Sequence, residues 1–579
     1  MVSNGKDLPR VAYFCMEYGL SDRLPIYAGG LGVLAGDYIK AARELNLPVV
    51  GVGIIWKQDY THQFIGADLR PYDVFPNIDY KFLKDTGVKV EVRIQGENVL
   101  CKVRFTKQFG NIPLYLLDTN FPGSTHGWIT KRLYGSKPAD RVAAEMVLGI
   151  GGVRALRALG IQADVYHFNE GHAALAGVEL VREKMQGQGM SFEDAWQETR
   201  KQVVFTTHTP VAAGNESFEH QLLRNSGAYN TLNYNQMQAL GGDPFNMTVA
   251  ALRLSRVTNA VSQAHGRTAK QMWAQVERTS PIIAITNGVH INTWQDRGIR
   301  EAYENGSDLW EPHLNLKRKL IDYIMRQTGA RLNENALLVG FARRAAPYKR
   351  SDLLFKNEEI IAPLLREKKI QLVFSGKAHP DDSRGKEIIR ALIKMDRKYQ
   401  DSIVFLENYN LEVACLMVQG CDVWLNNPRR PMEASGTSGM KAAVNGVLNL
   451  SVVDGWVGEG LRHSVNGWVI NEMEQEISDS EQDEEDLREL YRVLTDEVIP
   501  LYYAAGRSRW LDMMRASIDM ARWQFSSQRM VLEYYNKMYR KEALPEQVTE
   551  RFLPGREVPE LISWGEFQEN TNVFTYKRN

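Results

Sequence analysis

Residues 423–441 read VWLNNPRRPMEASGTSGMK, a short apolar segment followed by a turn rich in glycine, serine and threonine and then by a lysine. Similar apolar segments recur along the chain, and stretches with helical periodicity separate them; Leu31 to Leu45, for example, gathers its apolar residues on one face. This alternation predicts parallel sheets with crossover helices, a doubly wound α/β fold. The predicted strands are VAYFCM (11–16), PVVGVGI (48–54), VYHFN (165–169), VVFTTH (203–208), PIIAITNG (281–288), ALLVGFA (336–342), IQLVFSG (370–376), IVFLEN (403–408) and VWLNN (423–427).

The predicted strands fall into two sets. The first runs from about Arg10 to Asn287, and the second runs from Leu337 to about Val469. We therefore expect two Rossmann-like domains that face each other across a cleft. Ligands bind beyond the carboxyl ends of such strands, which is where the polar motifs fall.

The carboxyl-terminal part is predicted to be helical from Asp479 to Tyr539. Nine of the fifteen residues from Glu472 to Asp486 are acidic, and we interpret them as a solvated linker and helix start, where carboxylates suit the helix dipole. The predicted domains are residues 1–310, residues 311–535, and a helix and tail at 536–579 that pack back on the body.

Composition excludes several classes of protein. Seventy basic and seventy acidic residues cancel over 579 residues, so the chain lacks the charge of a general nucleic-acid binder. No apolar run is long enough to span a bilayer, because Arg154 and Arg157 interrupt the best candidate. The first twenty residues show no secretory signal, and the four cysteines lack CxxC spacing. We expect a cytoplasmic protein without a disulfide framework or a zinc site.

The turn at residues 428–441 is the most informative motif. Backbone amides at a turn that opens a helix can form a cradle for an anion. A lysine amine beside a phosphate cradle is what an aldehyde cofactor that carries a phosphate, pyridoxal phosphate, needs for covalent attachment. Spacing alone leaves the alternative of a glycine-rich turn with Lys441 at the surface.

Two further segments suit phosphate. Arg343, Arg344 and Lys349 place three positive charges within seven residues, although a solvated basic turn has the same composition. The glycines of AGGLG (28–32) let backbone amides approach an anion, although tight packing of a helix on a strand uses the same pattern.

The motifs together resemble those of the α-glucan (glycogen, starch and maltodextrin) phosphorylases. EASGTSGMK (433–441) is similar to the family's cofactor-attachment sequence GTEASGTGNMK, and the matches follow the family's order from about residue 11 to residue 460. Their short form is similar to the compact bacterial and archaeal branch, and we expect no control through the amino-terminal extension of the animal enzymes. The other similar segments are AGGLG (28–32), NEGHAAL (169–175), TTHTP (206–210), ITNGVHINTW (285–294), ARRAAPYKR (342–350), SGKAHP (375–380), VFLENYN (404–410) and VVDGWVGEG (452–460).

The resemblance implies phosphorolysis of terminal α-1,4-linked glucosyl units by inorganic phosphate, giving glucose 1-phosphate with retained configuration. It implies that Lys441 carries pyridoxal phosphate, whose phosphate relays a proton. By the same resemblance, Arg343 faces the cofactor phosphate, while Arg344 and Lys349 hold the substrate phosphate. The other implied cofactor-binding residues are Gly30, Thr437, Ser438, Gly439 and Tyr409. The implied substrate-binding residues are Gly30, Leu31, His172, His208, Asn287, Tyr348, Glu433, Ala434, Ser435 and Gly436.

Other functions remain open at this stage. A glycogen or starch synthase that uses a nucleotide sugar shares the GT-B type two-domain fold, but it has no use for Lys441. A catalytically silent carbohydrate-binding protein needs no phosphate pocket. His167, His172 and Glu170 lack the spacing of a metal site on one helix face, so we predict no metal. A glycosidase needs two opposed carboxylates, and nothing places Asp381 and Asp382 in that arrangement.

Three segments of the motifs differ from the family pattern. Ala28 replaces the family's asparagine, Ala345-Ala346-Pro347 replaces Ile-His-Glu, and Ser438-Gly439 replaces Gly-Asn. These changes affect acceptor preference and pocket polarity, and they leave the lysine and the phosphate cations in place. Family members commonly form homodimers, so the resemblance makes a homodimer one option for this chain, and the sequence does not identify a surface for it.

Overall fold

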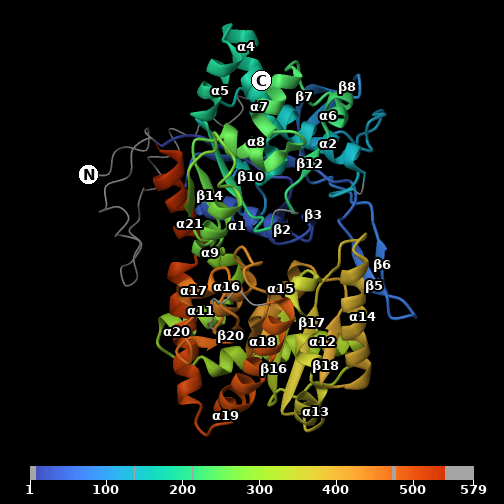
Figure 1. Cartoon of the computed structure of the whole chain (residues 1–579). Coiled ribbons are helices and arrows are strands. Elements are labelled where there is room, and N and C mark those ends of the chain that lie inside the picture. Colours follow the sequence, from blue (N-terminus) through green and yellow to red (C-terminus); the bar gives the residue numbers. More distant parts are fainter. Residues whose placement is uncertain (1–7, 136, 212–213, 472–477, 541–579) are drawn as a thin grey trace.

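The fold is a mixed α/β arrangement built on two large sheets. The computed structural model describes residues 8–135, 137–211, 214–471 and 478–540. The apolar segments of residues 10–287 form one sheet and those of residues 337–469 form another, as predicted. In Figure 1 the blue and green first half lies above the yellow and orange second half.

The first sheet has the strand order β15-β14-β11-β10-β1-β4-β9-β8-β7. Its strands from β15 to β9 pair in parallel. β7 and β8 extend this sheet as an antiparallel hairpin that the search for continuous apolar segments did not predict. The strands are β1 (Val11–Phe14), β4 (Val49–Ile54), β7 (Lys84–Ile94), β8 (Glu97–Thr106), β9 (Leu114–Asp118), β10 (Val165–Asn169), β11 (Val203–Thr207), β14 (Thr258–Ala260) and β15 (Ile282–Ala284).

The second sheet has the strand order β18-β17-β16-β19-β20-β21, and all of its pairs are parallel. Its four central strands are buried along their whole length, because helices cover both faces of a parallel sheet. The strands are β16 (Leu337–Ala342), β17 (Ile370–Ser375), β18 (Ile403–Leu406), β19 (Val423–Asn426), β20 (Leu448–Ser451) and β21 (Gly467–Val469).

Short hairpins and many helices complete the fold. The predicted helix after AGGLG is α1, and the helices begin at capping residues in several cases, such as Ser478 before α18. Within the described part of the chain, every helix is too short or too polar to cross a bilayer. The hairpins are β2 (Tyr18–Ser21) with β3 (Leu24–Ile26), β5 (His62–Ile65) with β6 (Pro71–Val74), and β12 (Ser217–Phe218) with β13 (Phe245–Asn246). The helices are α1 (Gly30–Glu44), α2 (Pro138–Met146), α3 (Gly152–Ala158), α4 (Leu175–Gln188), α5 (Phe192–Arg200), α6 (His220–Ser226), α7 (Tyr234–Gly241), α8 (Met247–Leu254), α9 (Gln263–Met272), α10 (Ile291–Trp294), α11 (Arg297–Glu304), α12 (Trp310–Thr328), α13 (Glu358–Arg366), α14 (Ser383–Lys398), α15 (Leu411–Gly420), α16 (Ser438–Ala443), α17 (Val457–Gly460), α18 (Asp479–Val493), α19 (Ile499–Tyr502), α20 (Ser508–Gln524) and α21 (Ser527–Tyr534).

The described carboxyl-terminal part is helical, as predicted. The red helix α20 lies with the second half in Figure 1, whereas α21 lies beside the first half. Met530, Val531 and Tyr534 of α21 belong to the apolar core of the first sheet. The predicted tail lies outside the described residues from 541 onward, and the boundaries of the domains stay a prediction.

The chain passes between the halves twice, and the two crossing segments are hydrogen-bonded to each other. Near Val289 it leaves the first half, and near Ser526 it returns. The Val289 amide donates to the Phe525 carbonyl at 2.8 Å, and the Ser527 amide donates to the Val289 carbonyl at 2.8 Å. A Cβ on Gly288 would collide with the Ser526 backbone, so this close approach requires glycine.

Candidate active site

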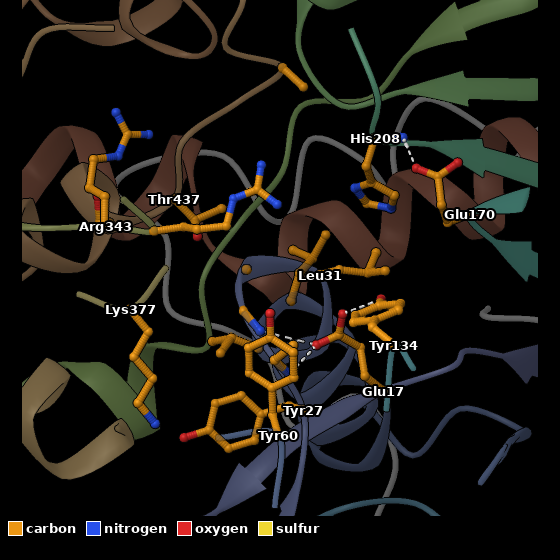
Figure 2. A pocket seen from close by; sticks show the side chains of 18 of the residues that line it. Glu17, Tyr27, Leu31, Tyr60, Tyr134, Glu170, His208, Arg343, Lys377 and Thr437 are labelled. Atoms are coloured by element: carbon orange, nitrogen blue, oxygen red, sulfur yellow. Dashed lines mark hydrogen bonds between the residues drawn. The ribbon is translucent and has the colours of Figure 1, made fainter. Parts of the chain in front are cut away.

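A large cavity lies between the two halves. Its volume is about 730 Å³, and residues from both halves line it. Loops that follow β1, β10, β11, β16, β17, β18 and β19 contribute to its wall, as expected for ligands at the carboxyl ends of parallel strands. Figure 2 shows Arg343 and Thr437 of the second half on one side, and Glu170 and His208 of the first half on the other.

The structure brings almost all the predicted site residues to this one cavity. Gly439 is the exception, because it does not line the cavity and a Cβ there would collide with Asn449 of the strand behind. Its position indicates tight packing rather than ligand contact. The predicted residues that line the cavity are Gly30, Leu31, His172, His208, Asn287, Arg343, Arg344, Tyr348, Lys349, Tyr409, Glu433, Ala434, Ser435, Gly436, Thr437, Ser438 and Lys441.

Two cations share one carboxylate in the cavity wall. Arg343 and Lys349 both donate to Glu433 Oε2. Burial alone would raise the pKa of Glu433, but the charges of Arg343 and Lys349 outweigh it and lower the pKa to about 2. Glu433 is therefore ionised at neutral pH and holds both cations at the cavity.

Positive charge exceeds negative charge at this wall. Arg343 Nη1 is buried and has no hydrogen-bond partner among the described residues. Arg344 is exposed, lines the cavity and forms no ion pair within the described part of the chain. Three cations with one ionised carboxylate form a site for anions, because an anion is the missing partner.

Asp454 supports the loop that carries Glu433. Its carboxylate accepts hydrogen bonds from the Glu433 amide and the Gly455 amide, both at 2.8 Å. Burial raises the pKa of Asp454 to about 7, and the nearby charge of Glu433 adds to the shift. Asp454 therefore titrates close to neutral pH and adds little negative charge below it.

Lys441 lies in α16 with its amine toward the cavity. Its side chain is 8% exposed, and its Nζ lies 4.1 Å from the centroid of the Trp294 ring. Burial lowers the pKa of Lys441, although the charge of Asp37 opposes the shift. A buried amine with a lowered pKa has a larger neutral fraction and is a better nucleophile.

Glu17 organises the glycine loop at the start of α1. Its Oε2 accepts from the amides of Ala28 at 2.7 Å and Gly29 at 3.2 Å, and Tyr134 donates to its Oε1 at 2.7 Å (Figure 2). A Cβ on Gly32 would lie 2.6 Å from the Glu17 carboxylate, so glycine is required there. The first amides of α1, at Gly30 and Leu31, have no hydrogen-bond partner within the helix, and both residues line the cavity.

The wall in the first half presents polar side chains, among them His208, His172 and Asn287. The His208 amide donates to Glu170 Oε2 at 2.8 Å, and its ring nitrogen Nε2 lies 2.7 Å from Asn169 Oδ1. Burial lowers the pKa of His208 to about 3, so its ring is uncharged at neutral pH. Asn287 Oδ1 and His172 Nδ1 are buried without a hydrogen-bond partner among the described residues. Unpaired polar atoms without charge suit the hydroxyl groups of a sugar.

The histidines considered for a metal do not form a cluster with each other. His167 turns away from the cavity, and its nitrogens contact Tyr539 at 2.6 Å and Thr206 at 2.7 Å. His172 instead lies near Glu145 and Glu216, with possible ligand atoms within 4.8 Å of one another. Arg141 pairs with Glu216, and burial raises the pKa of Glu145. Arg141 and the raised pKa of Glu145 thus offset the negative charge of these carboxylates, and the absence of a metal stays a prediction.

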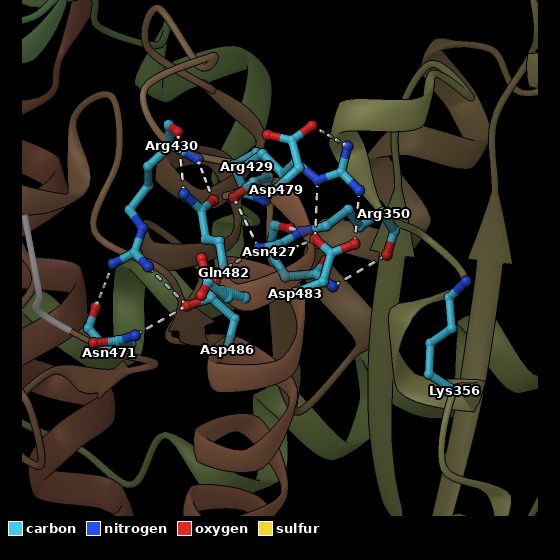
Figure 3. Close-up of polar contacts among 12 residues, drawn as sticks. Arg350, Lys356, Asn427, Arg429, Arg430, Asn471, Asp479, Gln482, Asp483 and Asp486 are labelled. Atoms are coloured by element: carbon cyan, nitrogen blue, oxygen red, sulfur yellow. Dashed lines mark hydrogen bonds and ion pairs between the residues drawn. The ribbon is translucent and has the colours of Figure 1, made fainter. Parts of the chain in front are cut away.

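A second charged cluster lies behind the loop that carries Glu433 (Figure 3). Arg350 pairs with Asp483 at 2.9 Å and with Asp486 at 2.7 Å, and Arg430 pairs with Asp486 at 2.8 Å. Arg429 pairs with Asp483 at 2.6 Å. The interpretation of the acidic segment as a solvated linker is therefore wrong for Asp483 and Asp486, which anchor the loop. Residues 472–477 of that segment lie outside the described residues.

Several residues of the site were not predicted from the sequence. They are Glu17, Trp294, Lys377 and Asp454, which stand at or next to the motifs of the family resemblance. No local pattern separates Trp294 and Asp454 from structural residues. Lys377 follows β17 and donates to the Thr61 carbonyl at 2.6 Å. Glu17 follows β1, so a search for polar residues after each predicted strand would have found both.

Comparison with known proteins identifies the family. A profile described as carbohydrate phosphorylase matches residues 302–466. The maltodextrin phosphorylase of Thermococcus litoralis is 38% identical over 612 residues, which cover 96% of this chain and 73% of that protein. This chain belongs to the carbohydrate phosphorylase family. The glycogen phosphorylase of Aquifex aeolicus is 35% identical to this family member over 92% of this chain and 86% of its own length.

A further relative has nearly the same extent as this phosphorylase family member. An uncharacterized protein of Methanocaldococcus jannaschii is 34% identical over 91% of this chain and 99% of its own length. The family profile spans Arg343, Arg344, Lys349, Glu433 and Lys441. The cationic wall and the buried lysine therefore lie within the matched region, whereas the polar wall of His208 and Asn287 precedes it.

Proposed function

We propose that this chain is an α-1,4-glucan phosphorylase, a glycosyltransferase with pyridoxal 5'-phosphate on Lys441. It transfers terminal glucosyl units to inorganic phosphate and releases glucose 1-phosphate with retained configuration. The observation that carries the proposal is a buried lysine amine in a cavity whose second-half wall holds three further cations with one ionised carboxylate. A phosphate-dependent enzyme needs such an excess of positive charge, because two phosphate groups side by side repel each other.

The residues of the cavity fit the cofactor. The Lys441 amine is buried and rests on Trp294. Its lowered pKa suits condensation with an aldehyde. Arg343 Nη1 is a buried donor without a partner among the described residues, as expected of a group that awaits an anion. The proposed cofactor contacts are Lys441, Arg343, Gly30, Thr437, Ser438 and Tyr409, while Gly439 supports the loop from behind.

Each wall has a separate task in the reaction. When bound, the cofactor supplies a phosphate group with a second pKa of about 6, which can give and take a proton near neutral pH. Arg344 and Lys349 hold the attacking phosphate by charge and hydrogen bonds. Glu433 is fixed in the ionised state, so it accepts hydrogen bonds from sugar hydroxyls and cannot deliver a proton itself.

The remaining contacts orient the glucosyl unit. Asn287 Oδ1 and His172 Nδ1 present unpaired polar atoms, and the His208 ring is held by Asn169. These groups are uncharged, so they bind hydroxyls without attracting the phosphate away from the cations. The proposed sugar contacts are Gly30, Leu31, His172, His208, Asn287, Tyr348, Glu433, Ala434, Ser435 and Gly436.

The names of the relatives favour an α-glucan as substrate, because those relatives are called maltodextrin and glycogen phosphorylases. The two facing sheets support a GT-B type arrangement, with domains at residues 1–310 and 311–535. The homodimer option and the cytoplasmic location stay predictions. A synthase that uses a nucleotide sugar is disfavoured, since it has no use for a buried amine at position 441.

The test is to supply maltodextrin and inorganic phosphate and to measure glucose 1-phosphate. Wild-type holoenzyme should form it, and Lys441→Ala should abolish formation while the variant still binds glucan. Borohydride should fix the cofactor on the Lys441 peptide. Lys377→Ala, which removes a half-buried amine from the same cavity, should leave that label in place. A colourless wild-type protein that uses a nucleotide sugar instead would reject the proposal.

A further inference from the structure

A buried carboxylate stands behind the lysine of the cavity. Asp37 lies in α1 and is 2% exposed, while Trp294 lies in α10 and is 1% exposed. Trp294 Nε1 donates to Asp37 Oδ1 at 3.0 Å and to Asp37 Oδ2 at 2.9 Å. The face of the same indole ring carries the Lys441 amine at 4.1 Å from its centroid. Trp294 therefore links Asp37 in α1 of the first half, at its ring edge, to Lys441 in α16 of the second half, over its ring face.

This arrangement is unusual for a buried carboxylate. Within the described residues, Trp294 is the one group shown to donate a hydrogen bond to Asp37. Burial of an ionised carboxylate is costly unless charge and hydrogen bonds compensate it. The cations around Asp37 are Lys40 and Lys441, and the charge of Asp37 opposes the loss of the proton from each of them.

The neighbours show which cation is available to Asp37. Lys40 Nζ is engaged elsewhere, since it donates to Thr293 Oγ1 at 3.1 Å and to the Leu20 carbonyl at 3.3 Å. Lys441 Nζ forms no hydrogen bond or ion pair with the described residues, and its cation–π contact with the indole face is the interaction that holds it. A hydrogen bond from the indole N–H to an anion also makes the ring face more negative, which strengthens its attraction for a cation.

We propose that Asp37 is a positioning residue for Lys441, which acts by holding the indole of Trp294 as a fixed platform under the lysine amine. Through this platform it sets the orientation and the charge state of the amine. The inference deepens the proposed function, because Lys441 is the residue proposed to carry the cofactor. It concerns contacts within the chain, so its test needs neither glucan nor phosphate.

The first experiment uses the protein without cofactor and needs no activity. Acetic anhydride labels neutral amines, so the labelling rate of Lys441 against pH, read from its peptide by mass spectrometry, reports its pKa. Asp37→Asn keeps an acceptor for the indole and removes the charge, so the pKa of Lys441 should fall. Labelling at pH 7 should then rise by about 3–10-fold, since one pKa unit is tenfold in neutral fraction. Lys377, a half-buried lysine that also lines the cavity, is the internal reference and should not change.

The second experiment separates the platform from the charge. Trp294→Phe keeps an aromatic face and removes the N–H, so uptake of pyridoxal phosphate, fixed by borohydride at intervals, should slow by about tenfold. In that background Asp37→Asn should have a much smaller effect on uptake than in the wild-type protein. Thermal unfolding of each variant confirms that the comparison is made on folded protein.

Two results would overturn the proposal. Equal labelling of Lys441 in the wild type and Asp37→Asn would show that the carboxylate does not act on the amine. Additive effects of Asp37→Asn and Trp294→Phe on uptake would show that Asp37 does not act through the indole. If Asp37→Asn does not fold, labelling of Lys441 in Trp294→Phe decides, because an unchanged pH profile there also rejects the platform. A wild-type protein that takes up no pyridoxal phosphate would reject the proposed function, while the labelling experiment still tests Asp37.

Discussion

Two clusters of arginine and carboxylate lie on opposite sides of one loop and differ in charge balance. The rear cluster joins Arg350, Arg429 and Arg430 to Asp479, Asp483 and Asp486, with three charges of each sign (Figure 3). The cavity cluster has Arg343, Arg344 and Lys349 but a single ionised carboxylate, Glu433. Adjacent residues, Lys349 and Arg350, belong to different clusters. The comparison indicates that the balanced cluster holds the loop and that the unbalanced cluster is kept for an anion.

The largest expected effect follows from removal of the cation that has no ion pair. Arg344→Ala should lower kcat/KM for phosphorolysis by about 10²–10⁴-fold, or roughly 3–5 kcal/mol, because the anion loses its fully available partner. Stability should be unchanged or slightly higher, since Arg344 repels the other cations. Steady-state kinetics with varied phosphate, together with a thermal melt, checks both parts. A variant that loses stability instead of phosphate use would contradict the assignment.

The rear cluster should respond in the opposite way. Asp486 is fully buried and binds two arginines, so Asp486→Asn should cost about 3–5 kcal/mol of unfolding free energy, because it leaves cations buried without their partner. Asp479→Asn is the matched control, since its side chain is 77% exposed and its ion pair is worth about 0–1 kcal/mol. Denaturant unfolding measures the difference. Equal losses in the two variants would remove the distinction between the clusters.

Phosphate should distinguish the clusters, because it should bind only at the cavity cluster and stabilise the folded protein through that cluster. At a phosphate concentration of 100 times Kd, binding adds about 2.7 kcal/mol to the unfolding free energy. The melting temperature of the holoenzyme should therefore rise in phosphate relative to chloride at equal ionic strength. This rise should disappear in Arg344→Ala and persist in Asp486→Asn. A rise that survives in Arg344→Ala would place the phosphate elsewhere.

The smallest expected effect is on the pH dependence of stability, through Asp454 next to the cavity cluster. Burial raises the pKa of Asp454 from an ordinary value of 3.8 to about 7, so the folded state holds a proton that the unfolded state has lost. Stability from this group therefore falls as pH rises between those two values. Asp454→Asn should show a smaller fall in melting temperature between pH 5 and pH 8 than the wild type. Parallel pH profiles for the two proteins would reject the raised pKa.

Much of this arrangement could be predicted from the sequence, because it depends on local pattern. Each cation and Glu433 follows a strand that an apolar segment marks, and parallel strands bring such positions to one edge. The antiparallel hairpin of β7 and β8 was missed, because VKVEVRI (88–94) alternates instead of forming a continuous apolar run. Alternation of this kind marks a strand with one exposed face.

The other omissions depend on packing between distant segments. Asp483 and Asp486 belong to an acidic stretch typical of solvent, and only the position of α18 against Arg350 gives them ion-pair partners. Asp37 is one polar residue on a mostly buried helix, and Trp294 lies 257 residues further along the chain. No local spacing indicates which of these residues will meet.

The contact between Val289 and Ser526 has a mechanical consequence. Because the two passages of the chain run side by side and are hydrogen-bonded to each other, they act as a single joint rather than as two separate tethers. For a rotation of one half about that joint, the parts of the molecule farthest from Gly288 would move the greatest distance.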